Sequence, residues 1–463
     1  MKILLINPSR NTHIKKSKKG FWPPLNLLTI AALTQKDIEI KIIDEEITPF
    51  DPAEKGDLVG ITSMSANSPR AYEIADHFKS KNIPVIMGGM HASMMTEEAL
   101  KHVTSVVIGE AEGQWDKVIN DYKNNNLKQI YKCENFPSLE YLPKPRRELL
   151  NHKNYFVFNT IQTARGCPYG CEFCSVSKFF GKTYRFRPVE EIVEEVKELK
   201  KYGKIFGFID DNIIGNIPRA KKLFKALIPL KIYWGSQATI NIGYDEELLY
   251  LAKKSGCNFL YIGFETVSKA ALNESNKNFN KPEDFKRLVK NIHKYKIPIL
   301  GSFVIGFDSD TPDTIKETVE FAKDAQVDLA LFHRLVPLPG TGFFKKMDEE
   351  GRILTKDWSK YWGYTVYKTK GMTENEITKQ IKWAEKEFYK LKSIFARIKI
   401  STYGKYVPLL WTFNLFLNKM GKNYHNGSGF LKAADKYLSH YNLKDKKNNL
   451  FKKFSASLSF TKH

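Results

Sequence analysis

The sequence predicts an α/β protein with two successive parallel sheets and a helical, basic C-terminal region. Short apolar runs alternate with helical patterns twice along the chain, which is typical of parallel strands covered by helices. This alternation ends near residue 346. We therefore expect a first domain over residues 1–135, a linker rich in proline and charge over 136–150, a barrel over 151–345 and a third region over 346–463.

The first domain carries five apolar runs that read as strands, with helical patterns between and after them. Five such strands suit a flavodoxin-like, Rossmann-type order, in which ligands bind beyond the carboxyl ends of the strands. The loops at those ends are rich in small residues, so a ligand can approach the backbone closely. The expected strands are Ile3–Ile6, Ile38–Ile43, Leu58–Ile61, Pro84–Met87 and Ser105–Ile108, and the expected helices are Leu25–Leu33, Arg70–Lys81, Thr96–His102 and Gly113–Tyr122.

The second alternation predicts a partial (β/α)6 barrel, open on one side, with its active site at the carboxyl ends of the strands. Helical patterns fit between the strands, for example over Pro188–Tyr202 and Pro282–Tyr295. The six expected strands are Val157–Thr163, Ile205–Asp210, Ile232–Gln237, Phe259–Glu265, Ile299–Ile305 and Leu329–Val336.

Composition narrows the class of protein. A hydrophobic content of 42% excludes a wholly disordered or collagen-like chain. Five cysteines in 463 residues are too few for a disulfide scaffold. The sequence shows neither a secretory signal nor an apolar run of about 20 residues, so we expect a cytoplasmic protein. The formal net charge of +22 would attract nucleic acid, acidic lipid headgroups or phosphorylated metabolites.

Three cysteines lie within eight residues, directly after the first barrel strand. They form the segment Cys167-Pro-Tyr-Gly-Cys171-Glu-Phe-Cys174. Clustered thiolates bind soft or borderline metals, and structural zinc is one alternative. Zinc would need a fourth ligand, yet no histidine lies nearby in sequence, and Cys133 and Cys257 are isolated. Three thiolates instead fit a [4Fe–4S] cluster with one iron free of protein ligands.

The Cys-x3-Cys-x2-Cys motif, with the aromatic Phe173 before its last cysteine, resembles that of the radical S-adenosylmethionine (SAM) superfamily. The resemblance implies that the open iron chelates SAM and that an electron from the cluster cleaves it. The resulting 5′-deoxyadenosyl radical abstracts hydrogen from an unactivated carbon, a reaction that cofactors must supply. Strand-end segments matching the family's SAM contacts are Gly207–Asn212, Gly263–Thr266, Gly301–Phe307 and Pro337–Thr341, which implies SAM-binding roles for Phe173, Asp210, Asp211, Glu265 and Ile305.

The first domain resembles that of the cobalamin-binding subfamily, and the resemblance covers roughly residues 1–390. The segment Phe21–Leu28 is similar to a Pro-Pro-Leu-Gly-Leu stretch, with Asn26 in place of the glycine. The Asp-x-His-x-x-Gly motif that supplies a histidine to cobalt is absent, so the lower axial ligand stays open. A domain that binds nothing is the alternative. The cobalamin-binding residues implied by the resemblance are Asn7, Ser63, Gly88, Gly89, His91 and Glu110.

The third region bears on the substrate. Asp357–Gly363 and Trp383–Phe395 resemble the tail of subfamily members that act on hopanoid or isoprenoid lipids. Residues 382–463 carry 17 basic and 4 acidic side chains, a net charge of +13, and we expect their final segment to be partly disordered. Within them, 13 uncharged residues separate Lys405 from Lys419. This stretch fits either a core helix or a segment that lies in an anionic membrane interface.

These features predict a cobalamin-dependent radical SAM enzyme that transfers a methyl group to an unactivated carbon of an apolar, lipid-like substrate. Radical cyclisation, oxidation or carbon–carbon coupling without methyl transfer is one alternative. A cluster-bearing nucleic-acid- or lipid-binding protein without catalysis is another. The expected cofactors are a [4Fe–4S] cluster, SAM and cobalamin. The expected partners are a flavodoxin- or ferredoxin-type electron donor and the inner face of an anionic membrane, ahead of nucleic acid.

Overall fold

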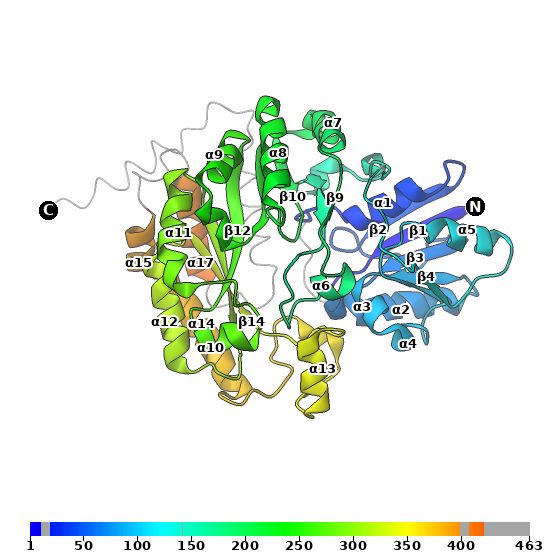
Figure 1. Ribbon diagram of the computed structural model, residues 1–463. Helices are drawn as coiled ribbons and strands as arrows, with labels where there is room; N and C mark the ends of the chain where they lie inside the picture. The colour runs from blue at the N-terminus through cyan, green and yellow to red at the C-terminus, as the bar shows by residue number, and fades with distance from the viewer. Residues whose placement is uncertain (11–18, 141, 399–406, 421–463) are drawn as a thin grey trace.

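The computed structural model describes residues 1–10, 19–140, 142–398 and 407–420. They form two halves, with the first sheet on the right of Figure 1 and the second on the left. The first sheet is parallel, in the order β2-β1-β3-β4-β5-β6, which confirms the flavodoxin-like prediction and adds a sixth edge strand. Its strands are β1 (Lys2–Asn7), β2 (Glu39–Asp44), β3 (Leu58–Thr62), β4 (Val85–Gly88), β5 (Ser105–Ile108) and β6 (Ile130–Lys132).

Helices cover both faces of this sheet, because alternate side chains of each buried strand point to opposite sides. On β1, Leu4 and Ile6 pack in one hydrophobic core, whereas Ile3 and Leu5 pack in the other. The first core is completed by α2 (Ser68–Lys79), α3 (Met90–Met94) and α4 (Thr96–Ala99), and the second by α1 (Leu25–Leu33) and α5 (Trp115–Lys123). Helix α3 begins within a stretch that the sequence had suggested to be a loop.

The second sheet is an open barrel in the order β14-β13-β12-β11-β10-β7, with every strand pair parallel. This confirms the predicted partial (β/α)6 barrel. Its strands are β7 (Asn159–Ile161), β10 (Ile205–Phe208), β11 (Tyr233–Ala238), β12 (Cys257–Glu265), β13 (Ile299–Ile305) and β14 (Leu329–Arg334). Its helices are α7 (Val189–Leu199), α8 (Ile217–Leu227), α9 (Glu246–Lys254), α10 (Lys269–Glu274), α11 (Pro282–Lys294) and α12 (Pro312–Asp324).

A small antiparallel hairpin, which the sequence patterns did not predict, follows β7. It pairs β8 (Ala164–Arg165) with β9 (Arg185–Phe186), in the register Ala164 to Phe186 and Arg165 to Arg185. The segment between the two strands contains the short helix α6 (Val176–Phe179) and all three clustered cysteines. The cysteine loop is therefore closed at its base by a two-residue ladder.

The third region is helical, as expected, with α13 (Gly342–Glu349), α14 (Glu374–Phe388), α15 (Leu391–Arg397) and α17 (Val407–Met420). Helix α13 crosses residue 345, and the expected domain boundaries stay a prediction. Helix α14 packs against α12 and β14 and so extends the outer layer of the barrel. Residues 421–463, which hold much of the basic tail and the segment expected to be disordered, lie outside the described residues.

Helix α17 contains the uncharged stretch that fitted either a core helix or a membrane-bound segment. Leu410 packs with Ile394 and Ile398. Asn414 is fully buried and donates to the Asp328 carbonyl at 3.1 Å. The described side chains thus support the core-helix interpretation. Within the described ranges, no helix is both long enough and apolar enough to cross a lipid bilayer.

Candidate active site

The two halves share one cavity of about 2870 Å³. Its walls are the loops after the first-domain strands and the inner faces of the barrel strands. Ligands of both fold types bind at the carboxyl ends of parallel strands, so the cavity lies where each half would hold its ligand. Of the residues implied by the resemblance, five lie on its wall: Asn7, Gly88, Gly89, Glu110 and Phe173.

Gly89 shows why small residues occupy the loop after β4. Its φ is 97°, and a Cβ there would lie 2.6 Å from the Ser63 carbonyl oxygen. A side chain would therefore be both strained and obstructed. Glycine keeps this backbone on the cavity wall, next to Gly88. Asn26 also lines the cavity, and its amide donates to Thr62 Oγ1 at 2.8 Å.

Ser63 and His91 do not line the cavity, and the cobalamin-binding role that the resemblance implies for them stays a prediction. The Ser63 carbonyl accepts from the His91 N–H at 3.1 Å, and its hydroxyl accepts from the Ala92 N–H at 3.3 Å. The His91 side chain is fully buried, with Nε2 3.5 Å from Glu98 Oε1. Burial lowers the pKa of His91 and outweighs the Glu98 carboxylate. Both residues therefore support the start of α3 beneath the cavity wall.

The cysteine loop is held by the segments that follow β12. The Glu172 N–H donates to the Ser275 carbonyl at 3.0 Å, and the Asn276 side-chain amide donates to the Gly170 carbonyl at 3.1 Å. Phe279 stacks on Tyr169 with ring centroids 3.7 Å apart. These contacts fix the backbone between the cysteines before any metal is bound.

The three thiols are half-buried, and burial raises the pKa of Cys167 to about 11 and that of Cys171 to about 12. Such thiols give up their protons when a metal binds. No three Cys, His, Asp or Glu side chains of the described ranges are placed to share a single metal ion. A [4Fe–4S] cluster does not require that arrangement, because each thiolate binds a different iron. The residues present fit the cluster.

Lys277 is a charged neighbour of this site that the sequence analysis missed. Its ammonium is buried, donates to the Gly263 carbonyl at 3.2 Å and pairs with the carboxylate of Glu265. Burial has the largest effect on the pKa of Cys171 and raises it. The Lys277 charge has the next largest effect and acts in the opposite direction, toward a lower pKa. A lysine just beyond a short helix carries no sequence signal for such a position.

Asp210 and Asp211 are adjacent at the end of β10 but differ in their surroundings. Asp210 is fully buried and accepts from the N–H groups of Thr163 and Ala164, at 2.6 and 3.1 Å. It therefore holds the start of the cysteine hairpin, and neither Asp210 nor Asp211 lines the cavity. Asp211 has a buried Oδ2 atom without a hydrogen-bond partner in the described structure, and burial raises its pKa to about 7. The Asp211 charge also raises the pKa of Cys167 and Cys174, in addition to burial.

Of the remaining implied SAM contacts, Phe173 lines the cavity, whereas Glu265 and Ile305 do not. Glu265 adopts a left-handed backbone with φ of 65° at the end of β12, where it pairs with Lys277. Phe173 reaches the cavity and packs edge-on against Phe307. Ile305 points into the hydrophobic core, and its neighbour Val304 lines the cavity instead.

A strap from the third region closes one side of the cavity. It is the segment 357–363, which the sequence analysis singled out for its resemblance to the tail of lipid-acting members. Trp358 is buried, and its indole N–H donates to Glu98 Oε1 of α4 at 2.8 Å. Trp358 also packs near Met95 of the first domain, and Tyr361 and Trp362 line the cavity. The chain thus returns from the barrel to the first domain.

Comparison with known proteins supports the assignment of the two halves of this chain. The radical SAM superfamily model matches residues 161–322, and the B12 binding domain model matches residues 14–119. The chain is 30% identical over 429 residues to bacteriochlorophyllide d C-12(1)-methyltransferase of Chlorobaculum tepidum, covering 90% of this chain and 93% of that protein. It is 28% identical to hopanoid C-2 methylase of Rhodopseudomonas palustris, over 73% of this chain and 65% of that protein.

Two solved structures share the fold. The cobalamin-dependent radical SAM enzyme OxsB superposes with a TM-score of 0.69 at 15% identity, covering 95% of this chain and 75% of OxsB. The radical SAM methyltransferase TsrM from Kitasatospora setae superposes with a TM-score of 0.66 at 14% identity, covering 95% of this chain and 99% of TsrM. At these identities the likeness concerns the fold.

Fold and site together define a radical SAM enzyme with a cobalamin-binding domain. The chain belongs to the family of cobalamin-dependent radical SAM methyltransferases. Its cofactors are a [4Fe–4S] cluster, SAM and cobalamin, and it acts on a small-molecule substrate. The comparisons do not favour the alternatives of a reaction without methyl transfer or of a binding protein without catalysis.

Proposed function

We propose that this enzyme transfers a methyl group to an unactivated carbon of a large, mostly apolar substrate bound between its two halves. The observation that carries the proposal is the single cavity onto which the carboxyl ends of both sheets open. A substrate there can face both a radical source in the barrel and a methyl donor in the first domain. Held between them, it reacts without diffusing from one site to the other.

We assign the cluster to Cys167, Cys171 and Cys174. When bound, cluster and SAM supply a carbon radical, and cobalamin supplies the methyl group. We propose that the buried Oδ2 of Asp211, which has no hydrogen-bond partner in the described structure, accepts from the SAM ammonium, and that Lys277 holds Glu265 in place beside the cysteines. Phe173 covers the cavity side of the same loop.

For cobalamin, we assign the loops after β1 and β4. The side chain of Asn7 is oriented by Asp44, to which it donates at 2.9 Å, and the glycines after β4 admit a ligand to the backbone. His91 faces Glu98 and Trp358 beneath the wall, and we therefore propose that it is not the lower ligand of cobalt.

The lining of the barrel supports an apolar substrate. Leu300, Val304, Leu331 and Leu335 all line the cavity there, around a polar pair made by the Tyr261 hydroxyl and His333 Nε2, 3.3 Å apart. The relatives named above are, by their names, methyltransferases of a bacteriochlorophyllide and of a hopanoid. We propose a substrate of this kind, with the lipid-like class ahead of others.

The test begins with anaerobic reconstitution. We expect about four irons and four sulfides per chain in the wild type, and none when Cys167, Cys171 and Cys174 are all replaced by alanine. The reconstituted enzyme is then incubated with reductant, deuterated SAM, and either host lipid extract or bacteriochlorophyllide d. A product carrying a deuterated methyl group supports the proposal. Stoichiometric zinc, or SAM cleavage with a product of unchanged carbon count, contradicts it.

We also propose two partners of this enzyme. A flavodoxin- or ferredoxin-type protein would supply the electron, because none of the assigned residues can.

The second partner is an anionic membrane. The net charge of +13 over residues 382–463 suits peripheral contact with such a membrane, where basic residues contribute about 1 kcal/mol each. Co-sedimentation with liposomes tests the second proposal. Binding should need anionic lipid, weaken with salt, and fall when residues 421–463 are removed. Binding to tRNA in place of liposomes would contradict it.

A further inference from the structure

Glu110 joins the first domain to the cysteine hairpin. It follows β5 and is almost fully buried between two arginines of the barrel half. Arg165 on β8 pairs with Glu110 Oε2, and Arg185 on β9 pairs with Oε1. A second bond from Arg185 reaches Oε2 at 3.3 Å. One carboxylate therefore binds both strands of the hairpin that carries the cysteines.

The neighbours of Glu110 strengthen this junction. The second nitrogen of Arg165 donates to Glu112 Oε1 at 2.6 Å. Burial would raise the pKa of Glu112, but the Arg165 guanidinium outweighs it, and the pKa lies below its usual value. Arg185 also donates to the Pro137 carbonyl of the linker at 2.7 Å. Charge-assisted, two-pronged bonds of this kind are strong and directional, and burial protects them from screening by salt.

The same loop faces the cavity. Gly109 and Glu110 both line it, and the Gly109 N–H donates to Ser93 Oγ of α3 at 2.9 Å. Glu110 is thus connected to the cobalamin side through its backbone and to the cysteine loop through its side chain. Its carboxylate is engaged by the arginines, and the cobalamin contact that the resemblance implies for Glu110 stays a prediction.

We propose that Glu110 is a positioning residue that fixes the cysteine hairpin against the first domain and so sets the separation between the SAM and cobalamin sites. The inference rests on the proposed function, because separation matters only if a methyl group passes between the two sites. Misplacement of reacting groups by 1 Å can lower a rate by about a hundredfold. Loosening the junction should then slow transfer between the sites far more than the chemistry within either one.

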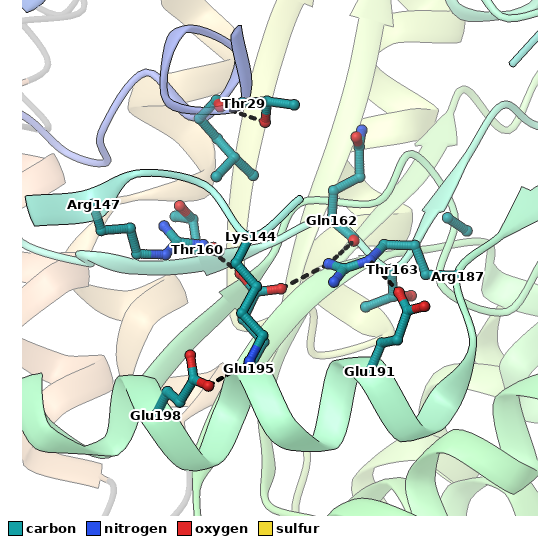
Figure 2. A network of polar contacts seen from close by, with 12 residues as sticks. Thr29, Lys144, Arg147, Thr160, Gln162, Thr163, Arg187, Glu191, Glu195 and Glu198 are labelled. Atoms are coloured by element: carbon teal, nitrogen blue, oxygen red, sulfur yellow. Dashed lines mark hydrogen bonds and ion pairs between the residues drawn. The ribbon is translucent and has the colours of Figure 1, made fainter. Parts of the chain in front are cut away.

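A matched control lies in the barrel half. Glu195 of α7 also bridges two arginines, with Arg147 at 2.8 Å and Arg187 at 2.7 Å, and is equally buried (Figure 2). The arginines donate in turn to carbonyls beside β7, those of Thr160 and Gln162.

The side-chain bonds of Glu195 all lie within the linker and the barrel. The turn that carries Arg147 touches the first domain through neutral contacts, such as the Arg146 N–H that donates to the Leu28 carbonyl at 3.1 Å, and Glu195→Gln leaves these in place. Loss of the Glu195 charge should destabilise the fold without changing how the halves are aligned.

The experiment compares Glu110→Gln and Glu195→Gln in the reconstituted full chain. One assay follows methyl transfer from SAM to added cob(I)alamin, in which the cobalt electron pair forms the Co–C bond and S-adenosylhomocysteine leaves. The other follows reductive cleavage of SAM, in which one electron breaks the C–S bond and yields methionine and 5′-deoxyadenosine. The ratio of transfer to cleavage should fall about tenfold or more in Glu110→Gln and stay at the wild-type value in Glu195→Gln.

A second readout does not depend on turnover. Pulsed electron paramagnetic resonance between cob(II)alamin and the reduced cluster should give a narrow distance distribution in the wild type and in Glu195→Gln, and a broad one in Glu110→Gln. If Glu110→Gln does not fold, Arg185→Gln replaces it. In that variant Arg165 keeps its bonds to Glu110 and Glu112, and of the bonds that Glu110 makes to the hairpin only those to β9 are lost. Equal ratios and equal distributions in both variants overturn the positioning role. A wild-type chain that holds neither cluster nor cobalamin would instead overturn the proposed function.

Discussion

Replacement of Gly166 by alanine should distort the cysteine hairpin, because this residue is confined both by its backbone and by its surroundings. Its φ is 88°, and a Cβ would lie 2.2 Å from the Thr183 carbonyl oxygen. To reach 3.0 Å, about the closest approach that real Cβ atoms show, Thr183 would have to retreat by about 0.8 Å. Thr183 lies two residues before Arg185, so the retreat would be felt at the hairpin base and at Glu110.

A second glycine allows the cost of the positive φ to be separated from the cost of the Cβ clash. Gly351 also has a positive φ, 64°, but a Cβ there would meet nothing within 4 Å. Gly351→Ala should therefore lose only the backbone preference, about 1 kcal/mol, whereas Gly166→Ala adds the clash and should lose about 3 kcal/mol. For a domain of about 150–250 residues, a loss of about 1 kcal/mol lowers Tm by about 2–4 °C, and a loss of about 3 kcal/mol lowers it by about 6–12 °C.

Differential scanning calorimetry of the cofactor-free chain measures the loss of stability, and iron analysis after reconstitution measures the effect on the cluster. We expect Gly351→Ala to retain its full iron content and Gly166→Ala to lose much of it. If both variants show the same Tm and the same iron content, the hairpin tolerates a side chain at position 166. The reasoning from Cβ placement would then be refuted.

Three further outcomes follow from the site. Asp211→Asn should weaken SAM binding by about tenfold or more, because a charged hydrogen bond is lost; unchanged affinity in equilibrium dialysis would remove Asp211 from the site. His91→Ala should lower Tm but keep cobalamin bound, and complete loss of cobalamin by a folded variant would make His91 a ligand. Glu385 of α14 lines the cavity, and burial raises its pKa from 4.5 to about 7. The folded chain therefore holds a proton that the unfolded chain releases, and stability falls as pH rises between these values. Urea unfolding at pH 5 and pH 8 should show that Glu385→Gln removes at most about 3 kcal/mol of this decline; an equal decline in both proteins would show that Glu385 does not titrate in this range.

The strands and the cysteine motif were predictable because they depend on local pattern. Buried parallel strands are nearly continuous apolar runs, and Ile299–Ile305 was predicted to the residue. The edge strand β6 and the hairpin β8–β9 were not, because they are two or three residues long and rely on pairing with distant segments.

The individual site residues were harder to predict, because burial is decided by partners far along the chain. The arginines that engage Glu110 lie 55 and 75 residues after it. Asp210 and Asp211 carry the same side chain, and the position of Thr163 and Ala164 decides which of the two carboxylates accepts from their N–H groups. At the end of β13, the side chain of Ile305 faces the core and that of its neighbour Val304 faces the cavity, a difference that a segment match does not show.

The strap at Trp358 has a consequence for how this enzyme can be divided. The first domain is covered by a segment that comes more than two hundred residues later, with Trp358 bound to Glu98 and packed near Met95. A fragment that ends at the linker would therefore bring apolar surface into contact with water, and Glu98 would lose the indole N–H that it accepts from. The cobalamin half is continuous in sequence but not self-contained in space. Fusions, truncations or exchanges of that half between relatives should carry the strap with them.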